Sequence, residues 1–150
     1  MHQHTLIRAM EGGLLGTLLQ TMTVYGVMPL LLGRSVEPAA MLEPSCAVDL
    51  LAHVCSGSVL FPLAYVCLPS QELQESPVLK GMLWAGLLWG ALEVLIAPML
   101  GAGVFSAALG GFPAAGRALL GYLVYGATLG GMVGAAERES RYASHTARRM

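Results

Sequence analysis

Four long apolar stretches, separated by short polar segments, dominate the chain. A helix needs about 20 residues to cross the hydrocarbon core of a bilayer, and each stretch is long enough. The third stretch is interrupted once, by Glu93. The pattern predicts an all-α, polytopic membrane protein with a single transmembrane domain over residues 1–150 and a basic cytoplasmic tail over 137–150. The four transmembrane helices are expected at residues 10–32, 46–68, 80–105 and 115–136.

The composition supports a membrane protein. Of 150 residues, 55% are hydrophobic and 11% are charged, whereas a soluble domain carries about 25% charged residues. The net charge of −1 gives no overall field that would attract nucleic acid. The cysteines Cys46, Cys55 and Cys67 lack CxxC spacing, which argues against a disulfide framework or a zinc site. Glu11, the long first apolar stretch and a start at Met1 argue against a cleaved signal peptide.

The distribution of lysine and arginine predicts the orientation in the membrane. Four spans put both termini and the middle loop on one side, and that side carries six of these residues against two, Arg34 and Arg117, on the other. Because cytoplasmic loops are enriched in lysine and arginine, both termini are expected in the cytoplasm. The expected location is the inner (plasma) membrane of the cell. The tail is expected to bind anionic lipid, or an acidic surface of a partner protein, through Arg138, Arg141, Arg148 and Arg149.

Glycines recur at intervals of four residues along three of the spans. This spacing lets the backbones of two helices approach closely. We therefore expect these glycines to pack against other helices. They are Gly12 and Gly16 in the first span, Gly86 and Gly90 in the third, and Gly126, Gly130 and Gly134 in the fourth.

The two halves of the chain align without a gap when they are shifted by 69 residues. The shift places Gly12 on Gly81 and Pro29 on Pro98, and it also superimposes Pro44 on Pro113. This predicts a tandem repeat of a two-helix hairpin, with the two copies related by an axis along the membrane normal. Chance agreement in a sequence rich in leucine and glycine is the alternative interpretation.

Glu93 is the most unusual residue of the spans, because a charge near the middle of a membrane costs at least ~2.5 kcal/mol. With a rise of about 1.5 Å per residue, Glu93 is expected in the outer half of the bilayer. His53, Tyr122, Tyr25 and Asp49 are expected at similar depths. The sequence therefore predicts an intramembrane polar cluster of these five residues.

Two interpretations of this cluster remain open. It could be protonatable and form a proton or cation path, or contact a quinone headgroup. It could also be a hydrogen-bonded network that fixes the register of the helices. Neither a metal site nor a bound cofactor is expected, because no span contains a second histidine to pair with His53 as a haem ligand. Sequence motifs of catalytic sites are also lacking.

Three short motifs carry a resemblance to a known family. They are His53-x-x-x-Gly57, the run P-M-L-G-A-G-x-F from Pro98 to Phe105, and Tyr125-Gly126. In these motifs the sequence resembles an uncharacterised family of small bacterial membrane proteins with four predicted spans. The resemblance covers nearly the whole chain, and it implies the four-helix architecture and no established activity. The last span of that family often begins with histidine, where Tyr122 stands here.

The leading hypothesis for the function is a non-catalytic integral subunit that packs against larger subunits of a membrane complex, with a respiratory or other electron-transfer complex as the expected host. Small size, glycine ridges and short loops motivate it. The alternative is a small oligomeric transporter or channel that uses the Glu93 layer. An assembly or lipid-binding factor is a third hypothesis, and an enzyme is the least expected.

Overall fold

A computed structural model describes residues 3–31, 44–67 and 76–147, with the side chains of 3, 44–49, 144, 146 and 147 excepted. These described ranges are helical and contain no β-strand. Four of the helices are long and apolar enough to cross a membrane, which confirms the predicted all-α fold of a multi-pass membrane protein. The four candidate spans are His4–Leu31, Leu50–Cys67, Pro77–Met99 and Phe112–Ala143.

Each of the first three spans is an α-helix that passes into a π-helical segment and then into a short second α-helix, whereas the fourth is one uninterrupted α-helix. The first contains α1 (Gln3–Thr21), η1 (Met22–Val27) and α2 (Met28–Leu31); the second contains α3 (Pro44–Cys55), η3 (Ser56–Leu60) and α4 (Phe61–Cys67); the third contains α5 (Pro77–Ala91), η4 (Leu92–Ile96) and α6 (Ala97–Met99). A 3₁₀ segment, η5 (Val104–Leu109), precedes the fourth span, α7 (Phe112–Ala147).

A proline explains each π-helical segment. Pro29, Pro62 and Pro98 follow the last residue of η1, η3 and η4 at an interval of two. Proline has no N–H, and its ring clashes with the carbonyl four residues earlier in a regular α-helix. Widening the preceding turn to π-helical i→i+5 bonds relieves that clash. α7 has no proline after its first turn, and it stays α-helical.

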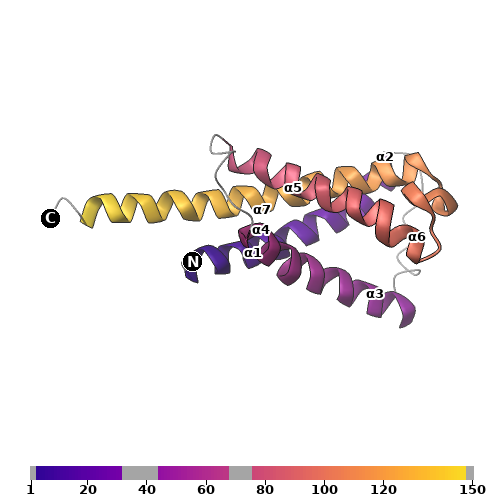
Figure 1. The fold of residues 1–150 in the computed structure, drawn as a ribbon, viewed down its shortest axis with the longest axis horizontal. Helices are drawn as coiled ribbons and strands as arrows, with labels where there is room; N and C mark the ends of the chain where they lie inside the picture. Colours follow the sequence, from indigo (N-terminus) through magenta and orange to yellow (C-terminus); the bar gives the residue numbers. More distant parts are fainter. Residues whose placement is uncertain (1–2, 32–43, 68–75, 148–150) are drawn as a thin grey trace.

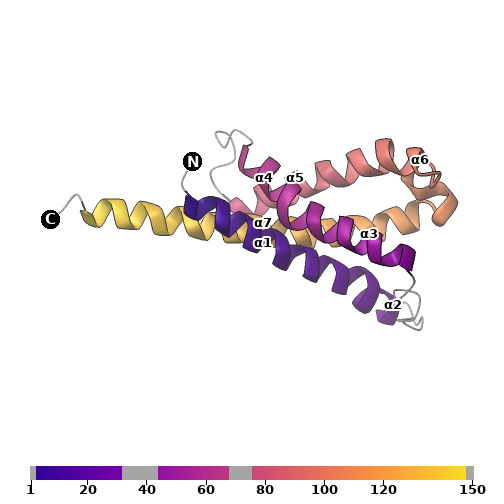
Figure 2. The same ribbon diagram turned by 90° about the horizontal axis from the view of Figure 1, so that it is seen from below.

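α7 is the central helix of the molecule. Both α1 and α5 pack along it, and the second span packs against α1 through η3 and α4 (Figures 1 and 2). The first part of the second span, α3, makes only slight contact with α1 and diverges from the α5–α6 arm in both views. The described bundle is therefore tightest around α7 and open around α3.

Glycine contacts hold α5 against α7 at backbone distance. A Cβ atom on Gly81 would collide with the carbonyl oxygen of Gly126, and one on Gly130 would collide with the carbonyl oxygen of Pro77. On the other side of α7, a Cβ on Gly16 would lie 2.9 Å from Cδ2 of Tyr125. Without side chains at these positions the helices gain van der Waals contact, which drives helix association in a membrane where lipid is as apolar as leucine.

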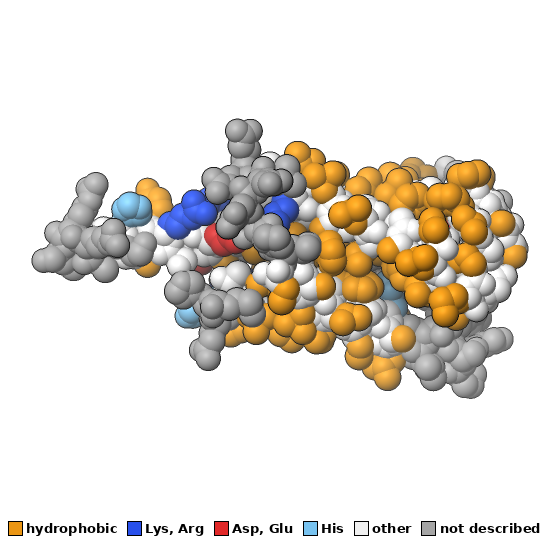
Figure 3. All heavy atoms as spheres, in the orientation of Figure 1, with side chains coloured by type: hydrophobic (Ala, Val, Ile, Leu, Met, Phe, Trp, Pro, Cys, Tyr) orange, Lys and Arg blue, Asp and Glu red, His pale blue; other side chains and the backbone are white. Residues whose placement is uncertain are grey.

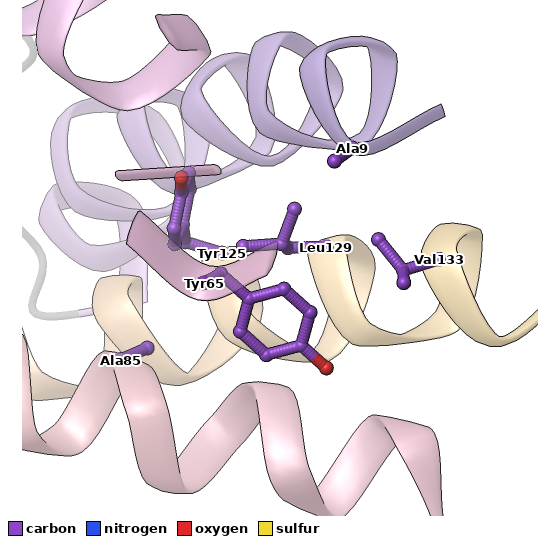
Figure 4. Close-up of a cluster of buried hydrophobic side chains, with 6 residues drawn as sticks. All are labelled: Ala9, Tyr65, Ala85, Tyr125, Leu129 and Val133. Carbon is purple, nitrogen blue, oxygen red and sulfur yellow. The ribbon is translucent and has the colours of Figure 1, made fainter. Parts of the chain in front are cut away.

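A cluster of buried side chains joins all four spans (Figure 4). Its largest members from α7 are Tyr125 and Leu129, and the ring of Phe61 meets Tyr125 edge-on with centroids 6.5 Å apart. The buried members are Ala9, Tyr65, Ala85, Tyr125, Leu129 and Val133. Because Ala9 and Val133 belong to it, the cluster lies toward the end of the bundle where the termini are.

Charged side chains gather at that same end. On the face shown in Figure 3, hydrophobic side chains cover the bundle, while lysine, arginine, aspartate and glutamate lie toward the two termini. An ion pair between Arg8 and Glu11, with 3.2 Å between Nη1 and Oε2, and Lys80, 5.1 Å from the centroid of the Tyr65 ring, mark this polar end.

The ends of the third and fourth helices differ from the expected ones. The third helix ends at Met99 rather than near Phe105, because Gly101 and Gly103 take positive φ angles of 80° and 74° that an α-helix cannot contain. The fourth continues without a break through the expected tail as far as Ala147. This part of α7 projects alone beyond the other helices (Figures 1 and 2).

Candidate functional site

Glu93 is buried in η4, with 7% of its surface exposed. Its carboxylate accepts a hydrogen bond from the Ser106 hydroxyl, with 2.8 Å between Oγ and Oε2. The backbone carbonyl of Glu93 is also unusual. Ala97 gives its N–H to the Leu92 carbonyl, and the next residue, Pro98, has none to give. Glu93 therefore has both a buried carboxylate and a backbone carbonyl deprived of its helical donor.

The segment between the third and fourth spans folds back over Glu93. Its hydrogen bonds are local, such as the 2.9 Å bond from the Ala108 N–H to the Ala102 carbonyl. Phe105 and Ser106 both occupy the left-handed region, with φ of 51° and 52°. Such a conformation costs on the order of 1–3 kcal/mol for each non-glycine residue, and strain of this kind tends to occur where function requires it. The strained pair includes the residue that binds the Glu93 carboxylate.

Three aromatic rings hold this segment in place. Phe105 lies between Trp89 and Phe112, with ring centroids 5.9 Å and 5.2 Å apart, respectively. The indole Nε1 of Trp89 donates a 3.0 Å hydrogen bond to the Ala115 carbonyl in α7. Since Trp89 is one helical turn before Glu93, the stack fixes the strained segment directly beside the carboxylate.

A second group of polar side chains lies between the first span and its two neighbours. Thr21 and His53 are hydrogen-bonded, with 3.2 Å between Oγ1 and Nε2, and the Thr21 hydroxyl also donates to the Thr17 carbonyl. The buried side chain of Gln20 interacts with the hydroxyl of Tyr122. These contacts tie α3 and α7 to the same turn of α1, which suits a network that fixes register.

The predicted five-residue cluster is divided in the structure. Tyr122 lies within range of the Glu93 charge. His53 contacts Thr21 instead and, among the described side chains, makes no ion pair with Glu93. Tyr25 is 55% exposed on η1. Asp49 belongs to α3, but its side chain is outside the described residues.

The expected packing glycines fall into two groups. Gly12, Gly16, Gly126, Gly130 and Gly134 each face another helix so closely that a Cβ would collide. A Cβ on Gly86 or Gly90 would meet nothing within 4 Å. α5 turns Gly81 and Ala85 toward α7, so residues 86 and 90 lie on the flank of the helix, away from this contact.

The structure places the tail only in part. Arg138 and Arg141 are exposed on the projecting part of α7. Arg148 and Arg149 are outside the described residues. Among the described side chains, no group of three histidine, cysteine, aspartate or glutamate residues could hold a metal ion.

Sequence reasoning missed Ser106 and the hydroxyl of Tyr125. Ser106 reaches Glu93 only because of a non-helical turn that the apolar pattern does not reveal. Tyr125 donates a 2.7 Å hydrogen bond to the Gly57 carbonyl, whose helical donors are unavailable because Phe61 bonds to Ser56 and Pro62 has no N–H. The polar character of Gln20 and Thr21 was visible in the sequence, but their partners were not.

Comparisons with known proteins give one match. The model of a family described as "Family of unknown function (DUF6789)" matches residues 3–144. No curated protein and no solved structure matches the chain.

Proposed function

The chain belongs to DUF6789, a family of unknown function, and we propose that it is a non-catalytic integral membrane subunit. In this role it packs against larger subunits of a membrane complex. One observation carries this proposal. Gly86 and Gly90 are spaced four residues apart on α5, as in a close-packing pair, and a Cβ on either would meet no described part of the chain within 4 Å. The glycines that face α7 show how this chain uses such pairs, which is to bring a helix backbone into contact.

The surroundings of the pair support a helix rather than lipid as its neighbour. Leu83 and Leu87, on the adjacent face of α5, are 48% and 70% exposed. A small-residue groove between large apolar side chains has the shape that a second transmembrane helix fills with van der Waals contact. Lipid tails would gain less from it because they are flexible and lose conformational entropy when they are ordered.

The proposal includes a location and a host. Six lysine and arginine residues against two support cytoplasmic termini and a place in the inner (plasma) membrane. A respiratory or other electron-transfer complex is the proposed host, because the chain adds a compact hydrophobic surface and no motif for a reaction of its own. Arg138 and Arg141 would then meet anionic lipid or an acidic part of a larger subunit.

Co-purification tests the subunit role. The wild-type chain, extracted in a mild detergent, is expected to retain larger membrane subunits. Gly86→Leu together with Gly90→Leu is expected to release them, because two leucine side chains would hold the helices apart. Leu15→Ala with Leu18→Ala is a control that changes two exposed leucines of α1 and leaves the glycine groove of α5 intact. A chain that runs alone as a stable homo-oligomer, with no larger subunit bound, would contradict the proposal.

A second function, transport or conduction of an ion by an oligomer, is favoured by the burial of Glu93 beneath Ser106. Glu93→Gln removes the charge with little change in volume and is expected to abolish proton or cation flux into liposomes. The matched control is Glu11→Gln, which changes an exposed carboxylate in the polar end of α1. Equal flux in the wild type and in the Glu93 variant would remove this candidate.

A further inference from the structure

We propose that Glu93 and Ser106 form a binding site for a small monovalent cation of the Na⁺ class, closed by the strained turn at Phe105 and Ser106. The site is the one that the second candidate function would use. Binding alone is required here, so a subunit that never transports an ion could also have it.

The charge of the site selects a monovalent ion. A buried carboxylate is costly in a membrane unless a proton or a metal cation neutralises it. Among the described side chains, no ion pair joins a lysine, arginine or histidine nitrogen to a Glu93 carboxylate oxygen within 4.0 Å. One negative charge without a cationic protein partner is neutralised by a single positive charge, and a divalent ion would need further carboxylates.

The oxygen atoms of the site suit the same ligand. Glu93 offers its carboxylate. The same turn of η4 also has a freed backbone oxygen, the Glu93 carbonyl, which receives neither the Ala97 N–H nor, because Pro98 has none, a donor from the next residue. Ser106 adds a hydroxyl 2.8 Å from the carboxylate. Interrupted transmembrane helices bind Na⁺ through such freed carbonyls together with side-chain oxygens. Tyr122 of α7, whose hydroxyl interacts with Gln20, adds no positive charge near Glu93.

The turn at Phe105 and Ser106 gives the site a way to close. Ser106 reaches the carboxylate only while both residues hold φ near 50°. The stack of Phe105 on Trp89 and Phe112 maintains that conformation. An ion drawn in by Glu93 and Ser106 would therefore stabilise the folded-back turn and alter the surroundings of Trp89.

Trp89 provides a direct measurement. The chain has two tryptophans, so Trp84→Phe leaves Trp89 as the sole indole reporter. The full-length protein in detergent is titrated with NaCl, and in parallel with KCl, while choline chloride keeps the ionic strength constant. We expect a saturable change in Trp89 fluorescence with Na⁺ or K⁺. Glu93→Gln should weaken the apparent affinity at least ~10-fold, and Ser106→Ala should weaken it about threefold or more.

Matched variants and a second measurement keep the test decisive. Glu11→Gln and Ser58→Ala change an exposed carboxylate and a hydroxyl that bonds within its own helix, and both should leave the titration unchanged. If the glutamine variant does not fold, the Ser106 variant and the Na⁺-dependent rise in the melting temperature of the wild type serve instead. The proposal is overturned if neither cation gives a saturable response, if Glu93→Gln responds as the wild type does, or if the response follows pH alone.

Because the titration needs no flux and no partner, it is independent of both functional proposals. Loss of binding together with intact co-purification would reject the ion site and leave the subunit role standing. Binding without flux would reject transport and leave the ion site standing.

Discussion

The hydroxyl of Tyr125 supplies a hydrogen bond that the backbone of the second span lacks. It donates to the Gly57 carbonyl over 2.7 Å, in the π-helical turn before Pro62, and the ring belongs to the buried cluster (Figure 4). In a bilayer there is little water to replace such a donor, so an unpaired carbonyl costs several kcal/mol in the hydrocarbon region. The Tyr125 hydroxyl of the fourth span therefore replaces the hydrogen-bond donor that Pro62 of the second span lacks.

Tyr125→Phe tests this role. The variant keeps the ring and removes the donor, so the free energy of unfolding is expected to fall by ~1–3 kcal/mol. Chemical unfolding in detergent, followed by circular dichroism, measures the loss. Tyr25→Phe, at an exposed tyrosine, should change stability by less than ~0.5 kcal/mol. Equal stability of the two variants would show that the Gly57 carbonyl does not need the hydroxyl.

The sequence identified Glu93 as exceptional, but it could not identify the partners of Glu93. Hydropathy marks a carboxylate inside an apolar run, and helix periodicity places it at a depth. Its bond to Ser106 depends instead on left-handed φ angles at two residues that have no particular preference for them. The division of the five-residue cluster has a similar cause, because depth alone does not determine which side of a helix a residue faces.

At the scale of elements, prolines shape three of the four spans. η1 and η4 end at Val27 and Ile96, which are 69 residues apart, and Glu93 occupies the place of Val24 in the first copy. This agreement supports the predicted tandem repeat, which remains a prediction. The second hairpin lacks the counterpart of Pro62, so η3 has no equivalent in α7.

Two glycines of α5 allow a matched comparison of helix contacts. Gly81→Ala places a methyl group against the carbonyl of Gly126 and should destabilise the isolated chain by ~1–3 kcal/mol. Gly86→Ala adds a methyl group in open space, and alanine favours a helix over glycine by about 0.5–1 kcal/mol, so stability should stay equal or rise. Thermal unfolding of both variants in detergent provides the measurement. A larger loss at position 86 would mean that the two faces of α5 are assigned in reverse.

The lengths of the helices were less predictable from sequence than their number. Four apolar runs gave four helices because length and hydropathy suffice to identify a span. The end at Met99 depends on glycine conformations in the following turn. The continuation of α7 to Ala147 arises because residues 137–147 contain no proline or glycine to stop a helix that is already formed.

At the scale of the whole molecule, both ends of the described chain lie at the end of the bundle where charged side chains gather (Figures 1 and 3). α7 has 36 residues and so a length of about 54 Å, which exceeds the ~30 Å of hydrocarbon by a wide margin. The excess lies beyond the polar end of the other helices. The orientation of this end therefore determines on which side of the membrane the projecting part of α7 lies.

Cysteine labelling from opposite sides of the membrane tests the orientation. In a chain whose three native cysteines are changed to serine, Arg138→Cys should be labelled by an impermeant thiol reagent only after the membrane is opened. Arg117→Cys, toward the other end of α7, should be labelled in intact cells. The reverse pattern would place the termini outside the cytoplasm and contradict the count of lysine and arginine.

The central position of α7 also has a consequence for biosynthesis. α7 is the last of the four spans to leave the ribosome, yet α1 and α5 both use it as their packing surface. Until it enters the bilayer, the faces of α1 and α5 that pack on α7, with Gly16 and Gly81, lack the partner that they have in the described bundle. A nascent chain stopped before Phe112 would therefore expose two helix-packing surfaces, one on α1 and one on α5. Incorrect helix–helix association is most easily formed in the interval before α7 enters the bilayer.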